Sequence, residues 1–124
     1  MAERRYTKNG EWILREGARC KVGLTVSAVE ELGDVTFVEL PRVGRSVVAG
    51  EALCTLEAVK AAADFYSPVD GTVAEANSRL GSEPELVNAS PEAEAWICVL
   101  EGVSDESFEA LMDEAAWKAW ESGR

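Results

Sequence analysis

Short β-favouring runs alternate with turn residues over much of the first 76 residues. Residues 11–15 and 34–40 are two such runs, and Pro41 ends the second. Gly44 and Gly50 bracket a further short run. A chain interrupted this often has little room for long helices, so the pattern predicts several short strands joined by tight turns.

The period of the apolar residues changes near the C-terminal end. Capping residues at 104–107 precede Phe108, Leu111, Met112 and Ala115, which fall at helical spacing. This predicts one broken helix or two short helices at about residues 104–121. The chain of 124 residues suits one domain, 1–124, which is mostly β with appended helices.

Local propensity is ambiguous in the middle of the chain. Residues 51–65 are rich in good helix formers, and Leu53, Leu56 and Val59 recur at every third position. Residues 67–71, Ser-Pro-Val-Asp-Gly, then form a turn signature between two β-favouring runs. Propensity alone therefore places Lys60 on a helix as an ordinary solvated lysine.

Charge and cysteine usage narrow the possible functions. The formal net charge of −11 disfavours binding to nucleic acid or to a membrane surface, and it suits either docking to basic partners or simple solubility. Cys20, Cys54 and Cys98 form no CxxC pair and histidine is absent, so we expect no metal site and no histidine-based catalysis. No signal peptide or apolar span is recognisable, and we expect a cytoplasmic protein with free thiols.

Lys60 and its surroundings resemble the modification site of lipoyl carriers, and most closely that of the glycine cleavage system H protein. The resemblance runs almost end to end. Its landmarks are residues 6–8, 11–12, 22–25, 32–34, 35–41, 50–51, 59–61, 64–71, 84–88 and Trp96, followed by acidic C-terminal helices. So many landmarks in order are far more specific than a single lysine motif.

The resemblance implies a lipoyl/biotinyl-type flattened β-barrel, or barrel-sandwich hybrid, with short helices. It places antiparallel strands near residues 53–57 and 62–66, with Lys60 exposed at the tip between them and lipoate amide-linked to its amine. A local propensity overridden at one place is expected of a functional site. Biotin is disfavoured because its carriers usually flank the lysine with methionines, whereas Val59 and Ala61 stand here.

The implied function is that of a non-enzymatic carrier whose lipoyl arm shuttles a bound intermediate between enzymes. Family resemblance makes Glu11 and Asp64 candidates for the pocket that shelters the loaded arm, with plain surface carboxylates as the alternative. Trp12 and Trp96 are expected to pack in the core. The implied partners are a lipoate ligase or transferase and dihydrolipoamide dehydrogenase, and we expect a monomer.

Some positions depart from the family pattern. Gly10 replaces the histidine usual before Glu-Trp, and residues 93–96 read Ala-Glu-Ala-Trp. Because cysteines suit sulfur chemistry, we prefer an H-like lipoate-binding protein that serves a heterodisulfide-reductase-like sulfur-oxidising complex. The first alternative is a glycine cleavage H protein, which carries an aminomethyl group between glycine decarboxylase and aminomethyltransferase. A second is an intermediary in lipoate transfer, and buried thiols without a redox role remain the simpler view of the cysteines.

Overall fold

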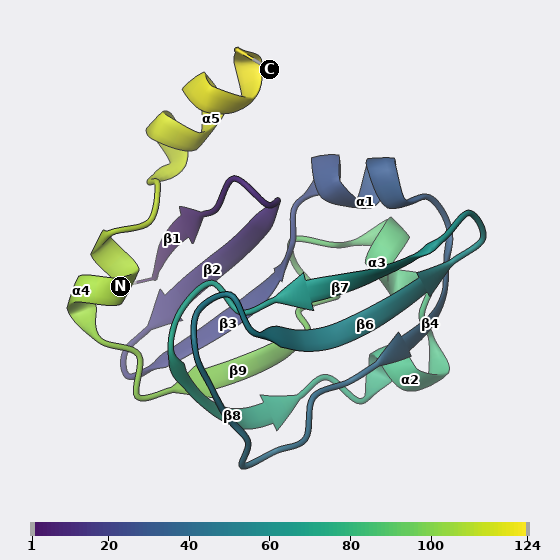
Figure 1. Cartoon of the computed structure of the whole chain (residues 1–124), viewed down its shortest axis with the longest axis horizontal. Coiled ribbons are helices and arrows are strands. Elements are labelled where there is room, and N and C mark those ends of the chain that lie inside the picture. Colours follow the sequence, from purple (N-terminus) through teal and green to yellow (C-terminus); the bar gives the residue numbers. More distant parts are fainter. Residues whose placement is uncertain (1, 124) are drawn as a thin grey trace.

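A computed structural model describes residues 2–123, and its strands form two antiparallel sheets (Figure 1). The larger has the order β1-β2-β3-β9-β8-β5 and the smaller has the order β4-β6-β7. The strands are β1 Glu3–Tyr6, β2 Glu11–Glu16, β3 Arg19–Leu24, β4 Val35–Glu39, β5 Ser46–Val47, β6 Ala52–Ala58, β7 Ala62–Tyr66, β8 Gly71–Ala76 and β9 Cys98–Glu101. The predicted class, mostly β with appended helices, is confirmed, although the described strands form two separate sheets rather than one closed barrel.

Five short helices lie within residues 2–123 and complete the described fold. They are α1 Val26–Leu32, α2 Arg79–Ser82, α3 Leu86–Ala89, α4 Asp105–Glu109 and α5 Glu114–Ser122. Thr25 caps α1 by accepting a hydrogen bond from the Ala28 amide, and Gly33 ends the helix with φ of 86°. None of the helices between residues 2 and 123 is long and apolar enough to span a bilayer.

The segment with helical propensity is a β-hairpin. Strands β6 and β7 pair antiparallel from Ala52↔Tyr66 to Glu57↔Ala62, with an irregularity between Ala52 and Cys54. The strands implied by the family resemblance are therefore confirmed, and the helix favoured by propensity is wrong. Tertiary pairing decides the outcome here, since β6 also pairs with β4 along its other edge.

Residues 95–100, Ala-Trp-Ile-Cys-Val-Leu, favour a strand by composition, but β9 begins only at Cys98. Residues before it are tied to loops and to β3 instead: the Ala95 amide donates to Ser90 O, and the Ile97 amide donates to Val22 O. Asn77 holds the same stretch, because its side-chain amide donates to Glu94 O and Trp96 O. The predicted C-terminal helices are confirmed as α4 and α5.

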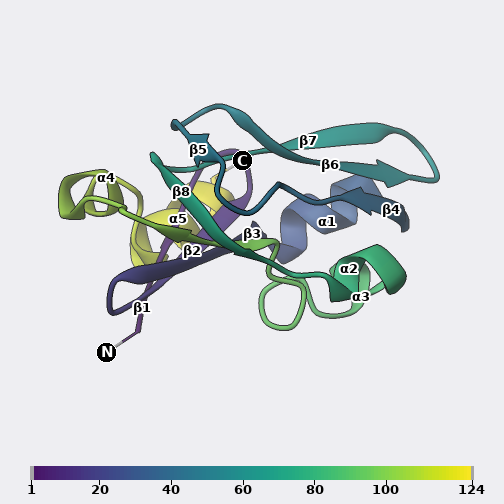
Figure 2. The same ribbon diagram turned by 90° about the horizontal axis from the view of Figure 1, so that it is seen from below.

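The main core lies between the two sheets, which Figure 2 shows as separate layers, with the β6–β7 hairpin extending beyond the larger sheet. A second cluster contains Tyr6, Trp12 and Trp117, with Trp96 packed against it. Tyr6 and Trp117 stack with ring centroids 4.5 Å apart, and this contact fixes α5 on the sheet. The expected core packing of Trp12 is confirmed, whereas Trp96 is half-buried and packs against this cluster.

Candidate functional site

Lys60 stands at the tip of the β6–β7 hairpin. The tip, residues 59–61, has no glycine and no residue with positive φ, and Val59 is 74% exposed. The Ala58 amide donates to Ala61 O at 2.9 Å and closes the turn. The Val59 amide donates to Asp34 O at 3.0 Å, which ties the tip to the segment after α1. The tip is thus held by a tertiary contact and not by turn-forming residues.

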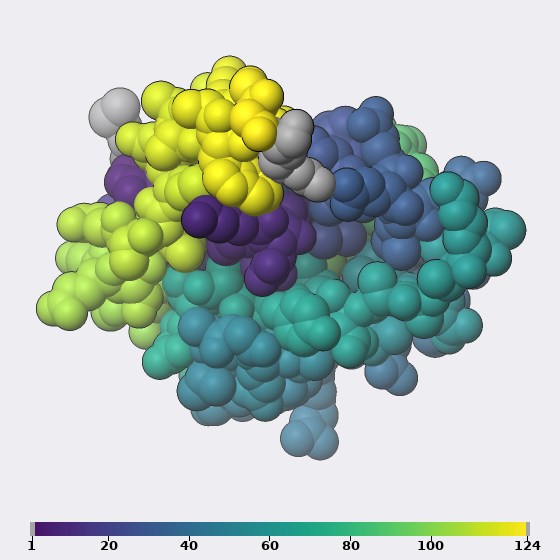
Figure 3. Space-filling view, turned by 45° about the horizontal axis from the view of Figure 1, so that its top comes forward, coloured from purple at the N-terminus to yellow at the C-terminus, as the bar shows by residue number. Residues whose placement is uncertain are grey.

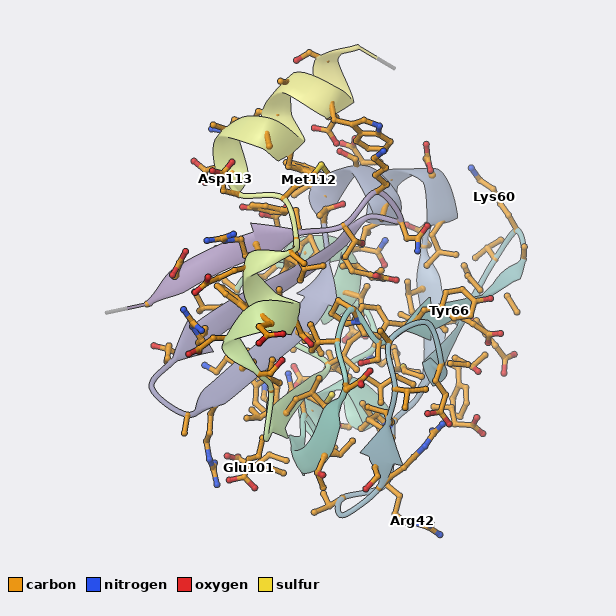
Figure 4. The ribbon with its side chains drawn as sticks, turned by 60° about the vertical axis from the view of Figure 1, so that its left-hand side comes forward. Arg42, Lys60, Tyr66, Glu101, Met112 and Asp113 are labelled. Atoms are coloured by element: carbon orange, nitrogen blue, oxygen red, sulfur yellow. The ribbon has the colours of Figure 1, made fainter. Side chains whose placement is uncertain are left out.

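The Lys60 side chain runs past Gly33 toward the end of α1 (Figure 4). A Cβ atom at Gly33 would lie 3.3 Å from Lys60 Cε, so the absence of a side chain at Gly33 leaves room for the lysine. Within residues 2–123, no hydrogen bond or salt bridge engages the Lys60 ammonium group. This lysine is exposed, and its amine is accessible for covalent modification.

A cavity of about 260 Å³ opens beside the hairpin, between α1, β7 and the turn before β2. Its walls are largely apolar, and three polar side chains join them. The lining residues are Asn9, Leu24, Ala28, Glu31, Leu32, Leu56, Ala63 and Asp64. Leu32 immediately precedes Gly33, against which Lys60 lies, so the cavity starts next to the lysine side chain. Figure 3 shows the hairpin tip at the edge of the molecule beside α1.

The two carboxylates expected near the arm lie in different surroundings. Asp64 is exposed, lines the cavity and accepts a hydrogen bond from Thr55 Oγ1 at 3.0 Å. Glu11 is only 3% exposed, does not line the cavity and accepts a hydrogen bond from Thr7 Oγ1 at 2.9 Å. The surface alternative therefore fails for Glu11, and the arm-pocket roles of both carboxylates stay predictions.

The burial of Glu11 affects its protonation. Burial raises the pKa of Glu11 from 4.5 to about 7, and hydrogen bonds from Thr7 and from the Tyr66 backbone offset part of this rise. Tyr66 ends β7, so the carboxylate joins β2 of the larger sheet to the base of the hairpin. The sequence carried no signal of this burial, because Glu11 opens a strand directly after a turn.

The cysteines lie in the core, away from the hairpin tip. Cys20, Cys54 and Cys98 are buried free thiols. Burial raises the pKa of Cys54 and that of Cys98 to about 12, so both remain protonated and unreactive near neutral pH. Across the described residues, no three His, Cys, Asp or Glu side chains gather as a metal site.

Two features of the site escaped the sequence-based reasoning. The apolar cavity walls come from α1, β3, β6 and β7, and no single segment shows their convergence. The second is Gly33, which ends α1 and also gives space to Lys60. The Leu-Gly-Asp run at residues 32–34 was among the family landmarks, which was the one available signal.

The glycine cleavage H-protein family model matches residues 4–122. The glycine cleavage system H protein of Phenylobacterium zucineum is 47% identical over 116 residues, which is 94% of this chain and 96% of that protein. The protein of the same name from Thermotoga maritima is 47% identical over 119 residues, 95% of each chain. A crystal structure of a glycine cleavage system H protein from Mycobacterium marinum superposes with a TM-score of 0.83 at 30% identity, covering 97% of both chains.

All three of these proteins bear the glycine cleavage name, so the preference for a sulfur-oxidation carrier is unsupported and the glycine cleavage alternative is better supported. The buried, protonated thiols give no structural reason to restore that preference. Since the family model spans nearly the whole chain and relatives at 47% identity cover at least 94% of it, this chain belongs to the glycine cleavage H-protein family.

Proposed function

We propose that this chain is a glycine cleavage lipoyl carrier with lipoate joined by an amide bond to Lys60 Nζ. It carries an aminomethyl group between glycine decarboxylase and aminomethyltransferase. Members of the family carry lipoate covalently on a lysine and act with partner enzymes, without being catalysts themselves. The observation that supports Lys60 is its exposed position at a hairpin tip beside an apolar cavity.

Two other lysines, Lys21 and Lys118, are less suited to the role. Lys21 Nζ lies 5.6 Å from the centre of the Trp96 ring, on the face of the larger sheet. Lys118 Nζ pairs with Glu114 at 3.3 Å within α5. Neither stands at a projecting turn, whereas a ligase or a partner enzyme can approach Lys60 from several directions.

The surroundings of Lys60 fit a long, mostly apolar arm that ends in a polar cargo. When bound, lipoate supplies a strained cyclic disulfide that one incoming group can open reductively. Leu24, Leu32 and Leu56 offer apolar walls that exclude water from such an arm. Asn9 and Asp64 add polar groups to the same walls, and the Asp64 carboxylate is suited to an ammonium group.

Lys60 acts as a tether in this proposal. Amide formation removes the positive charge of Nζ, so the loaded side chain can lie against apolar side chains without the cost of burying an ion. The bond between the Val59 amide and Asp34 O keeps the tip beside α1, where the cavity begins. The flexible arm raises the local concentration of cargo at each docked enzyme.

The attachment site is tested by intact mass after incubation with lipoate and a lipoate ligase. We expect the wild-type chain to gain one lipoyl group and Lys60→Arg to gain none, because the guanidinium cannot form the amide. Lys118→Arg is the matched control and should gain the group as the wild type does. A mass gain that persists in Lys60→Arg overturns the assignment.

The cargo is tested with the lipoylated protein. We expect glycine and glycine decarboxylase to open its disulfide reductively, which leaves the aminomethyl group on one sulfur and a thiol on the other. Dihydrolipoamide dehydrogenase should re-form the disulfide only after aminomethyltransferase has removed that group. Failure with glycine, combined with activity in a reconstituted sulfur-oxidising system, contradicts the glycine cleavage assignment. Transfer of the lipoyl group to another unmodified carrier identifies instead an intermediary in lipoate transfer.

A further inference from the structure

Asn88 reaches from α3 to the segment that joins α1 to β4. Its Oδ1 accepts a hydrogen bond from the Val35 amide at 2.8 Å, and its Nδ2 donates to Gly33 O at 2.8 Å. Asn88 is half-buried, and it stands more than 50 residues from both partners in the sequence. One side chain thus binds both ends of the turn at residues 33–35.

The same turn supports the hairpin tip. Asp34, its central residue, accepts the hydrogen bond from the Val59 amide, and Gly33 packs against the methylene groups of Lys60. The tip has one other hydrogen bond among the described backbone groups, between Ala58 and Ala61 at its own mouth. The position of Lys60 relative to the cavity therefore depends on the position of this turn.

We infer that Asn88 is a positioning residue for Lys60 and fixes the turn that holds the hairpin tip beside the cavity. This inference rests on the proposed attachment of lipoate to Lys60. A tip fixed before docking presents its lysine in one arrangement, and a ligase or partner then loses less conformational entropy on binding. The residue acts through the turn, and it does not touch the reacting amine.

The chemistry of an amide explains the choice of side chain. Asparagine can accept from one backbone group and donate to another at the same time. A carboxylate at the same position keeps the acceptor for the Val35 amide but has no donor for Gly33 O. Asn88→Asp should therefore loosen the turn, and Asn88→Ala should loosen it further because it removes both bonds.

Asn77 offers a matched control. Its amide also makes two hydrogen bonds to backbone, to Glu94 O at 2.9 Å and to Trp96 O at 2.8 Å. Asn77 is buried. Neither of these two hydrogen bonds involves the hairpin tip or the turn at residues 33–35. Asn77→Ala should thus cost stability as Asn88→Ala does, without loosening the tip.

The first measurement is amide hydrogen exchange of Val59 by NMR in the unmodified protein. We expect Asn88→Ala to accelerate this exchange about tenfold, from the loss of two hydrogen bonds at the turn, with Asn88→Asp between it and the wild type. Asn77→Ala should leave the exchange unchanged. Equal acceleration in both alanine variants, or none in either Asn88 variant, overturns the inference.

The second measurement is the KM and kcat of a lipoate ligase with each variant as its protein substrate. The temperature is kept well below the unfolding temperature of every variant. We expect Asn88→Ala to raise KM about fivefold with kcat retained, because a mobile tip binds less readily while the docked lysine is unchanged. Unaltered KM for a folded Asn88→Asp or Asn88→Ala contradicts the inference. If the wild type itself is not lipoylated, the proposed function fails, whereas the exchange measurement still decides the link from Asn88 to the tip.

Discussion

Two hairpins of this molecule reach their turns by different means. The β2–β3 hairpin closes at Gly17 and Ala18, between the paired residues Glu16 and Arg19, and Gly17 has φ of 62°. A Cβ atom added at Gly17 would meet no atom within 4 Å, so no other element packs against this position and the turn depends on its own backbone. The β6–β7 tip has no such residue and is held by Asp34 from outside.

The difference shows how an attachment residue can occupy a turn. A glycine-based turn is specified by its own sequence, and it leaves the conformation of the turn independent of distant elements. In the β6–β7 hairpin, the conformation of the tip depends instead on the neighbouring turn at residues 33–35, which Asn88 holds through two hydrogen bonds. The tip residues are then free to be small and accessible, as docking of partner enzymes requires.

Truncation of a buried side chain in a strand of each hairpin should give the largest loss in the free energy of unfolding. Leu56 in β6 and Ile13 in β2 are 1% and 0% exposed. We expect Leu56→Ala and Ile13→Ala each to lower the free energy of unfolding by about 3 to 4 kcal/mol, because each leaves a cavity in a packed core. Urea denaturation measures both losses.

The same two variants also distinguish the hairpins by their effect on amide exchange at the β6–β7 tip. Leu56 also lines the cavity beside Lys60, so its truncation should accelerate exchange of the Ala58 amide at the mouth of the tip. Ile13→Ala should accelerate that exchange only as far as global unfolding requires. The contrast between the two hairpins fails if Ile13→Ala loosens the tip as much as Leu56→Ala does.

The Glu11 carboxylate, which accepts a hydrogen bond from the Tyr66 backbone at the end of β7, should make the stability of the protein depend on pH. Burial raises the pKa of Glu11 in the folded protein to about 7, above the ordinary value of 4.5. The folded state therefore holds more protons than the unfolded state between these two values. Stability from this group is complete below pH 4.5 and is lost as the pH rises to 7, by about 3 kcal/mol in total.

Glu11→Gln tests this dependence, because a neutral amide can still accept the hydrogen bond from Thr7. Urea unfolding at pH 5, 6, 7 and 8 should show a variant that gains stability over the wild type as the pH rises. Glu16→Gln, at the exposed end of the same strand, serves as the control and should show no such gain. A constant difference between Glu11→Gln and the wild type contradicts the prediction.

The sequence predicted the short strands, the C-terminal helices and the position of Lys60 to different degrees. Composition and turn residues were enough for the β class, because glycine and proline act locally. The lysine hairpin needed the family resemblance, because local propensity at residues 51–65 favours a helix and pairing with β4 overrides it.

Other parts of the site were beyond sequence reasoning for a physical reason. Asp64 lines the cavity while its role toward the arm stays a prediction, and the burial of Glu11 depends on how β2 meets the end of β7. The hydrogen bonds of Asn88 join residues more than 50 positions apart, and no local pattern encodes them. Contacts of this kind follow from the packing of the two sheets and of α1 with α3.

The smallest predicted effect compares one glycine from each turn region. Gly17 and Gly33 both have positive φ, at 62° and 86°. Alanine should cost about 1 kcal/mol in the free energy of unfolding at Gly17, because an L side chain is strained at positive φ. It should cost about 2 kcal/mol at Gly33, whose φ of 86° and ψ of −163° are open essentially to glycine alone. Thermal or urea unfolding of Gly17→Ala and Gly33→Ala measures both losses.

Only Gly33→Ala should alter the surroundings of Lys60. The new methyl group at position 33 would lie 3.3 Å from Lys60 Cε, whereas at position 17 it would meet nothing within 4 Å. The lysine chain is flexible and can move aside at little energetic cost, but it then leaves its place beside α1. Gly33→Ala should therefore raise the KM of a lipoate ligase while Gly17→Ala leaves it unchanged. Equal KM values for the two folded variants contradict a presenting role for the turn at residues 33–35.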